Sequence, residues 1–167
     1  MGSFAYSDPS NRSSPTELKN VIVERKDYES ISSQARELFN YQTVFESKIE
    51  REWLLNNVRS TTIQIKVDES LYEVNSNYVL NDQQKFVLIL HEFDETHNWT
   101  IWTKMIEPLS RRCSYSVILV DLPGFGQSDG RDLNQASWKR HGPEIIVAIL
   151  SSFHIEQPVN NYTCDLW

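Results

Sequence analysis

Two short apolar runs dominate the hydrophobic pattern of this chain, Phe86–Leu90 and 117–120. Runs of this length, rich in β-branched residues and bounded by turn residues, are typical of strands buried on both faces, as in a parallel sheet. Between them, apolar residues recur at three- and four-residue steps over 98–112, which predicts a helix that buries Trp99, Trp102, Ile106 and Leu109. We therefore expect a strand–helix–strand unit, with Pro108 kinking or shortening the helix.

A second pattern precedes this unit. Residues 62–67 alternate between polar and apolar, which places Ile63, Ile65 and Val67 on one face. A polar turn then leads to a second short alternating stretch, 71–74, so the pattern predicts an antiparallel hairpin. We expect 75–84 to form a loop that leads into the strand 85–90.

After the second apolar run, the chain is predicted to form one more helix, over 141–153. Pro143 suits the first turn of such a helix, and its apolar face would consist of Ile145, Ile146, Ile149 and Phe153. The segment 155–167 begins as the approach to another strand and turns polar at Asn160 and Asn161.

The amino-terminal third of the chain has a different composition. Residues 1–16 are rich in Ser, Asn and Pro, which predicts a disordered tail. Residues 17–58 are charged and lack Gly, with apolar residues at helical spacing, so we expect one long helix or two shorter ones. This helical extension either packs on the following domain, 61–167, or binds a protein partner.

Charge and cysteine content narrow the classes of function. The net charge of −7 and the absence of a basic block argue against nucleic acid or an anionic membrane surface as the partner. No apolar stretch is long enough for a membrane span, and the first residues do not form a signal peptide, so we expect a cytoplasmic protein. Cys113 is expected to be a free thiol at a helix end.

Candidate chemistry lies where the two predicted buried strands end, at His91 and Asp121. Ligands bind outside the carboxyl ends of strands in open α/β sheets. The loop after Asp121 contains Gly124 and Gly126, but a dinucleotide fingerprint needs a third Gly at Asp129. The chain has no phosphate-binding P-loop and no metal-ligand spacing among its four histidines, so we expect neither a cofactor nor a metal.

The run that follows the second strand reads Asp-Leu-Pro-Gly-Phe-Gly-Gln-Ser over residues 121–128. Together with the hairpin, the strand that ends in His91 and the intervening helix, it resembles the amino-terminal half of the α/β-hydrolase fold, over about 61–159. Glu144-Ile145-Ile146 and the stretch 155–159 resemble the approach to the family's nucleophile strand. The resemblance implies an α/β fold with a partial hydrolase-like sheet, in which a hairpin joins parallel strands with flanking helices, beside the helical extension.

The resemblance also implies roles for single residues. The loop after His91 would form the oxyanion loop, with His91 structural and the backbone N–H of Phe93 as the oxyanion donor; Glu92 stands at the family's usual Gly. Cys164 falls at the position of the nucleophile, although Tyr162 and Leu166 occupy the two Gly positions of the G-x-S-x-G elbow.

No serine of the chain has the sequence context of that elbow, and the family's later acid and histidine are not found. We therefore expect a truncated hydrolase, related by resemblance to enzymes of small-molecule ester, amide or other acyl substrates, that is inactive by itself. Its strand 85–90 would then have one open edge. The alternative is a non-catalytic interaction or adaptor protein that uses the helices of 17–58.

Overall fold

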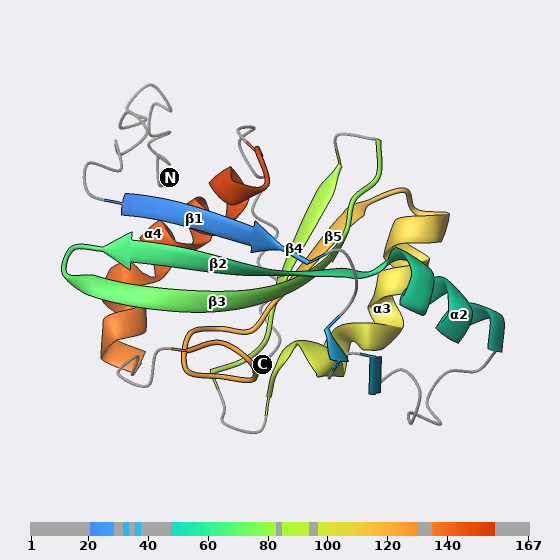
Figure 1. The fold of residues 1–167 in the computed structure, drawn as a ribbon, viewed down its shortest axis with the longest axis horizontal. Helices are drawn as coiled ribbons and strands as arrows, with labels where there is room; N and C mark the ends of the chain where they lie inside the picture. The colour runs from blue at the N-terminus through green and yellow to red at the C-terminus, as the bar shows by residue number, and fades with distance from the viewer. Residues whose placement is uncertain are drawn as a thin grey trace, which may run out of the picture.

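A computed structural model describes residues 21–28, 32–33, 36–37, 48–82, 85–93, 97–129 and 135–155. Its centre is a five-stranded mixed sheet in the order β1-β2-β3-β5-β4 (Figure 1). The strands are β1 (Val21–Asp27), β2 (Arg59–Val67), β3 (Ser70–Val79), β4 (Phe86–Leu90) and β5 (Ser116–Val120). With helices flanking this sheet, the fold is of the α/β type.

The mode of strand pairing changes once along the sheet, from antiparallel to parallel. β1, β2 and β3 pair antiparallel, β3 pairs antiparallel with β5, and β5 pairs parallel with β4. The predicted hairpin is confirmed: β2 and β3 align Ile63 with Val74 and Ile65 with Tyr72. β3 is longer than predicted and includes 75–79, because its second half pairs with β5.

Helices lie on both faces of the sheet. They are α2 (Lys48–Asn57), the 3-10 turn η1 (Trp99–Trp102), α3 (Thr103–Glu107), the wider turn η2 (Pro108–Arg112) and α4 (Gln135–Ser152). α4 lies behind β1–β3, whereas α2 and α3 lie at the opposite end of the molecule (Figure 1). Among the described residues, none of the helices is both long and apolar enough to cross a membrane.

β5 separates two apolar cores. Ile118 and Val120 belong to the core against α4, and Val117 and Leu119 belong to the core against α2 and α3. Every residue of β5 is buried, which confirms the prediction of a strand covered on both faces. The first core also contains Ile63, Ile65, Val74, Ile145, Ala148 and Ile149, and the second contains Leu54, Val58, Trp99 and Ile106.

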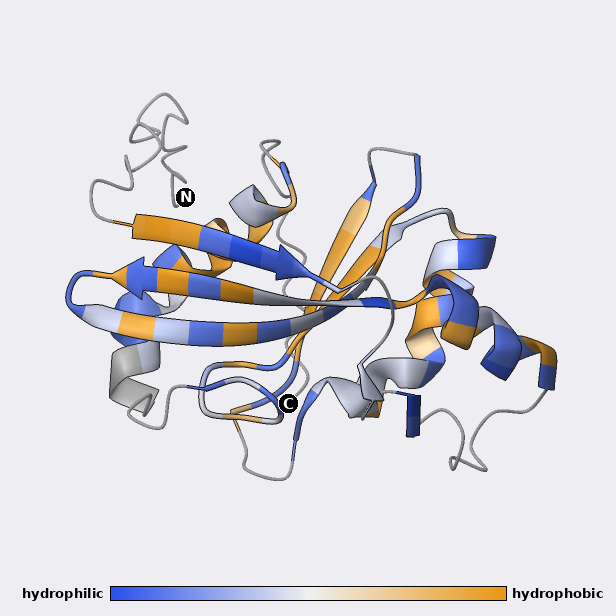
Figure 2. Cartoon of the chain, in the orientation of Figure 1, coloured by the Kyte–Doolittle hydropathy of each residue, from blue (hydrophilic) through white to orange (hydrophobic). Residues whose placement is uncertain are grey.

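The other apolar run forms β4, which is not buried on both faces as the sequence predicts. All five residues of β4 are only partly buried. Within the described part of the chain, β4 pairs with β5 alone, so its second edge has no strand beside it. β4 and β5 are both strongly apolar in Figure 2, and the difference in their burial therefore comes from their place in the sheet.

The prediction of helix throughout 17–58 is wrong at Val21–Asp27, which forms strand β1. Val21 and Val23 pack on the core beside β2, and their partners in the register are Val67 and Ile65. Long-range pairing thus overrides local helix propensity here. The helix prediction is confirmed at α2, whose Leu54 is fully buried. The predicted disordered tail, 1–16, lies outside the described residues.

The helices near the site also differ in detail from the predictions. The predicted helix 98–112 is divided into η1, α3 and η2, and Pro108 begins the last of these segments. Pro cannot donate the usual backbone hydrogen bond, which explains the change of geometry at that position. α4 begins six residues before the predicted start, so Pro143 lies inside the helix and not in its first turn.

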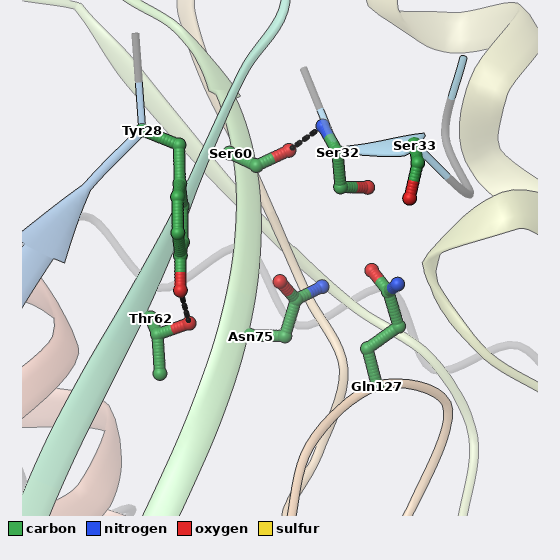
Figure 3. A pocket seen from close by; sticks show the side chains of 7 residues that line it. All are labelled: Tyr28, Ser32, Ser33, Ser60, Thr62, Asn75 and Gln127. Carbon is green, nitrogen blue, oxygen red and sulfur yellow. Dashed lines mark hydrogen bonds between the residues drawn. The ribbon is translucent and has the colours of Figure 1, made fainter. Parts of the chain in front are cut away.

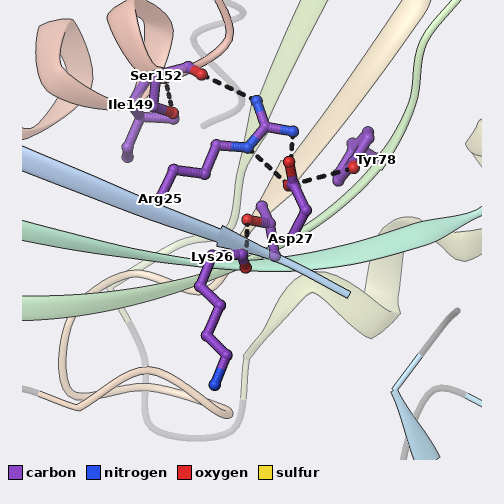
Figure 4. A network of polar contacts seen from close by, with 7 residues as sticks. Arg25, Lys26, Asp27, Tyr78, Ile149 and Ser152 are labelled. Carbon is purple, nitrogen blue, oxygen red and sulfur yellow. Dashed lines mark hydrogen bonds and ion pairs between the residues drawn. The ribbon is translucent and has the colours of Figure 1, made fainter. Parts of the chain in front are cut away.

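β1 is joined to the carboxyl end of α4 through Arg25 (Figure 4). Its Nη1 donates to the Ser152 carbonyl at 2.9 Å, and its Nη2 lies 2.7 Å from Asp27 Oδ1. The guanidinium lies over the Phe153 ring at 4.0 Å. Tyr78 donates to the same Asp27 oxygen at 3.3 Å, and burial raises the pKa of Tyr78, so its hydroxyl stays protonated.

Candidate functional site

The carboxyl ends of β4 and β5 lie side by side because these two strands are parallel neighbours. His91 follows β4 and is buried, and its Nε2 accepts a hydrogen bond from the Leu122 backbone N–H at 2.9 Å. The proton of the neutral ring must therefore be on Nδ1, which lies 2.6 Å from the Glu92 carbonyl oxygen and donates to it. The imidazole joins the two loops and has no free nitrogen for proton transfer.

Asp121, the first residue after β5, is the buried acid of the site. Its Oδ1 accepts from the Trp99 backbone N–H at 2.8 Å, and its Oδ2 accepts from the Gln127 backbone N–H at 2.9 Å. The Asn75 amide lies 3.4 Å from Oδ2 and donates to it. Burial raises the pKa of Asp121, although these hydrogen bonds act in the opposite direction. The carboxylate thus connects β3, the start of η1 and its own loop.

The glycine at position 126 allows this arrangement. Its φ is +54°, and a side chain there would overlap the Asp121 carboxylate. Gly therefore satisfies both the backbone conformation and the close approach of the loop to the acid. The signal in the sequence was the spacing Asp121-x-x-Gly124-x-Gly126, and the structure gives it a physical reason.

Ser128, the last residue of the motif, closes the loop. Its Oγ donates to the Asp121 carbonyl at 2.6 Å and accepts from the Asn75 backbone N–H at 2.7 Å. The next residue, Asp129, donates its backbone N–H to the Glu73 carbonyl at 2.9 Å, which attaches the loop to β3. The Ser128 hydroxyl is therefore fully used in structure and is not available as a nucleophile.

Aromatic rings pack the two loops together. Phe125 makes edge-to-face contacts with His91, at 5.2 Å between ring centroids, and with Phe93, at 4.8 Å. Phe93, which the resemblance assigns as oxyanion donor, thus lies at the carboxyl edge of the parallel pair. Its backbone N–H makes no hydrogen bond with any residue that the structure describes. Glu92 is exposed, with Oε2 3.6 Å from His97 Nδ1.

The two cysteines lie apart from these loops or outside the described residues. Cys113 is a free, exposed thiol at the end of η2. It precedes the amino end of β5, whereas the two loops follow the carboxyl ends of β4 and β5. Cys164, predicted at the nucleophile position, lies outside the described residues. Within the described ranges, no three His, Cys, Asp or Glu side chains form a cluster that could hold a metal ion. Among the described residues, the loops position backbone donors and do not place a nucleophile beside a base.

Sequence reasoning did not find two participants. Asn75 was expected in a loop, yet it lies in β3 and contacts both Asp121 and Ser128. The sequence pattern predicts Trp99 only as a buried helix residue, whereas its backbone N–H donates to Asp121. No local pattern marks either role, since each depends on which strand lies beside β5.

Comparison of the chain with protein-family models, curated proteins and solved structures finds no match.

Proposed function

We propose that this chain is an α/β-hydrolase-like protein whose two loops at the carboxyl ends of β4 and β5 form the oxyanion side of a site for ester, amide or related acyl substrates. The observation that carries the proposal is the pair of hydrogen bonds that cross between the loops, from Leu122 to His91 and from Trp99 to Asp121. They connect the segments on either side of Phe93 to the loop after β5. Preorganised backbone donors are what acyl transfer needs at a developing oxyanion.

The strand arrangement also supports the proposal. The order β2-β3-β5-β4, with only the last two strands parallel, is the order that the resemblance implies for the first four strands. β1 is an addition at the far edge. The nucleophile strand would lie next to β4, on the edge that no described strand covers.

The proposal separates binding from turnover. We assign a proposed oxyanion loop to the described residues, but the polar side chains of His91, Asp121 and Ser128 make hydrogen bonds within the protein. We therefore expect this chain to bind acyl groups weakly and to lack triad hydrolysis by itself. Cys164 is the one proposed nucleophile, by position in the resemblance alone.

An NMR titration tests the binding half. Butyrate, a small carboxylate that imitates an acyl oxyanion, should shift the Phe93 amide resonance in the 167-residue chain. Glu92→Gly should tighten this binding, because it removes a carboxylate beside the anion and restores the small residue of the family's loop. Glu69→Gly, at an exposed turn away from the loops, is the control. A Phe93 amide that does not respond in either Glu92 form would contradict the proposal.

Hydrolysis of p-nitrophenyl butyrate tests the catalytic half. We expect no turnover above the buffer rate for the purified chain. Turnover that Cys164→Ala abolishes would show that Cys164 is a nucleophile and that the site is complete. Turnover that survives this substitution would show a nucleophile other than the one proposed.

The interaction-protein alternative is less well supported by the described part of 17–58. β1 pairs with β2 along its whole length, and α2 buries Leu54 in the core. Both elements therefore pack within the domain itself. An exposed Ile49 on α2 is a single apolar residue and does not define a partner surface.

A further inference from the structure

A polar hollow of about 420 Å³ lies on the face of the sheet opposite α4, next to the Asp121 loop (Figure 3). The side chains of β2 and β3 alternate between faces, so Ser60, Thr62 and Asn75 lie opposite to the apolar residues of the first core. The hollow is lined by Tyr28, Ser32, Ser33, Ser60, Thr62, Asn75 and Gln127. All of these side chains carry a hydroxyl or an amide, and none is charged at neutral pH.

We propose that this hollow binds a small neutral polyhydroxylated molecule, of the class of monosaccharides and cyclic polyols. This inference goes beyond the proposed acyl site and is independent of it. The chemistry of the lining, the state of one buried acceptor and the charges around the hollow all point to this ligand class.

The buried acceptor is the side-chain oxygen of Gln127. Oε1 is fully buried and has no hydrogen-bond partner among the described residues. The Gln127 backbone is fixed, because its N–H donates to Asp121 at 2.9 Å. Figure 3 shows the amides of Gln127 and Asn75 extending into the same space as the Ser33 hydroxyl. A buried acceptor without a partner is costly, so a rotation of the Gln127 amide that presents Oε1 to a ligand O–H would recover this lost hydrogen bond.

Hydrogen bonds within the protein fix several hydroxyl groups of the surrounding wall. The Ser60 hydroxyl donates to Asn77 Oδ1 at 2.7 Å and accepts from the Ser32 backbone N–H at 2.9 Å. The Tyr28 and Thr62 hydroxyls lie 3.3 Å apart, with the Tyr28 ring along one side. Hydroxyl groups of a ligand can match such a lining because each can donate and accept. The Tyr28 ring supplies an amphipathic surface for the C–H groups of a ring.

Charge disfavours an anionic ligand. The Asp121 carboxylate lies directly behind Asn75 and Gln127, within hydrogen-bonding distance of both. A phosphate or carboxylate in the hollow would face this buried charge and would leave Gln127 Oε1 without a donor. Lys26 has its Nζ 5.7 Å from the centroid of the Tyr28 ring. A neutral ligand avoids the repulsion and satisfies the acceptor.

An NMR titration of the 167-residue chain tests the proposal. The ligands are myo-inositol and, separately, glucose, and the backbone and side-chain amide resonances report binding. We expect saturable shifts at Asn75 and Gln127, including their side-chain NH₂ groups. Gln127→Met keeps the length of the side chain and the backbone N–H, and should weaken binding roughly three- to tenfold. The matched control is Gln64→Met, on the same face but exposed and outside the lining, which should bind as the wild type does.

Several results would overturn the proposal. These are no saturable shift by either polyol up to about 0.1 M, equal weakening by Gln127→Met and Gln64→Met, or tighter binding of inorganic phosphate than of myo-inositol at the same resonances. If circular dichroism shows that Gln127→Met does not fold, Thr62→Val replaces it as the test variant and should weaken binding. In that case, wild-type shifts confined to residues outside the hollow would contradict the proposal.

Discussion

The imidazole of His91 and the backbone of Leu122 are joined by a hydrogen bond in which the Leu122 N–H donates to Nε2 at 2.9 Å. This contact joins the residue after β4 to the loop after β5, and it sets the tautomer of the ring. Asp121 adds a second connection through the Trp99 N–H. The two loops are therefore positioned by buried polar contacts as well as by packing, and substitutions at these contacts have predictable results.

Asp121→Asn should destabilise the fold by about 1–3 kcal/mol at neutral pH. The carboxylate accepts from a backbone N–H on each of its oxygens, whereas an amide has one oxygen and would turn an NH₂ group toward the other donor. Urea unfolding measures the change. Asp82→Asn, at an exposed position, is the control and should stay within about 0.5 kcal/mol of the wild type.

The pH dependence of this difference follows from the raised pKa of Asp121. Because the folded state holds the proton more tightly than the unfolded state, the stability contributed by this group is fully present below the ordinary value of 3.8. It falls as the pH rises through the folded pKa. The advantage of the wild type over Asp121→Asn should therefore shrink as the pH rises from 3.8. An advantage that grows over this interval would mean that the folded pKa is lowered instead.

Gly126→Ala should cost about 2–4 kcal/mol. Part of the cost comes from the positive φ, and the rest comes from overlap of the new methyl group with the Asp121 carboxylate. A double-mutant cycle with Asp121→Ala separates the two, because removing the carboxylate relieves only the overlap. If Gly126→Ala costs the same with and without the Asp121 carboxylate, the close approach is not the reason for the glycine.

Ser128→Ala should lower the unfolding free energy, measured by urea unfolding, by about 1–3 kcal/mol. The substitution leaves the Asn75 backbone N–H without its acceptor and removes the hydrogen bond to the Asp121 carbonyl. Ser151→Ala, on the exposed side of α4, is the control for stability. An effect no larger than that of Ser151→Ala would mean that the two Ser128 hydrogen bonds do not stabilise the loop.

Arg25→Lys should destabilise the protein by about 1–2 kcal/mol and speed hydrogen exchange in β1. A lysine cannot contact Asp27 and the Ser152 carbonyl together, nor can it stack flat on Phe153 as the guanidinium does. The matched control is Arg140→Lys, which should have little effect. The Arg140 side chain is mostly exposed, and its ion pair with Asp68 is long, at 4.0 Å. Equal effects of the two substitutions would show that the Arg25 contacts are not specific.

The resemblance in the sequence located the loop of the candidate site but not its partners. The motif from Asp121 to Ser128 has a local reason, since the acid, the glycine at 126 and the serine all act within one loop. Asn75 acts on this loop from β3, 46 residues away in the chain from Asp121. Such a contact depends on the pairing of β3 with β5, which no local pattern contains.

The amino-acid sequence alone determined the elements whose signal is local: the hairpin, the buried strand β5 and the glycine loop, because alternation, apolar runs and turn residues act over a few positions. Tertiary structure decided the rest. Val21–Asp27 forms a strand because it pairs with β2. Within the described residues, β4 pairs with β5 alone and is only half-buried. The polar hollow exists only where Tyr28, β2, β3 and Gln127 meet, and contacts between such distant segments arise from the packing of the whole chain.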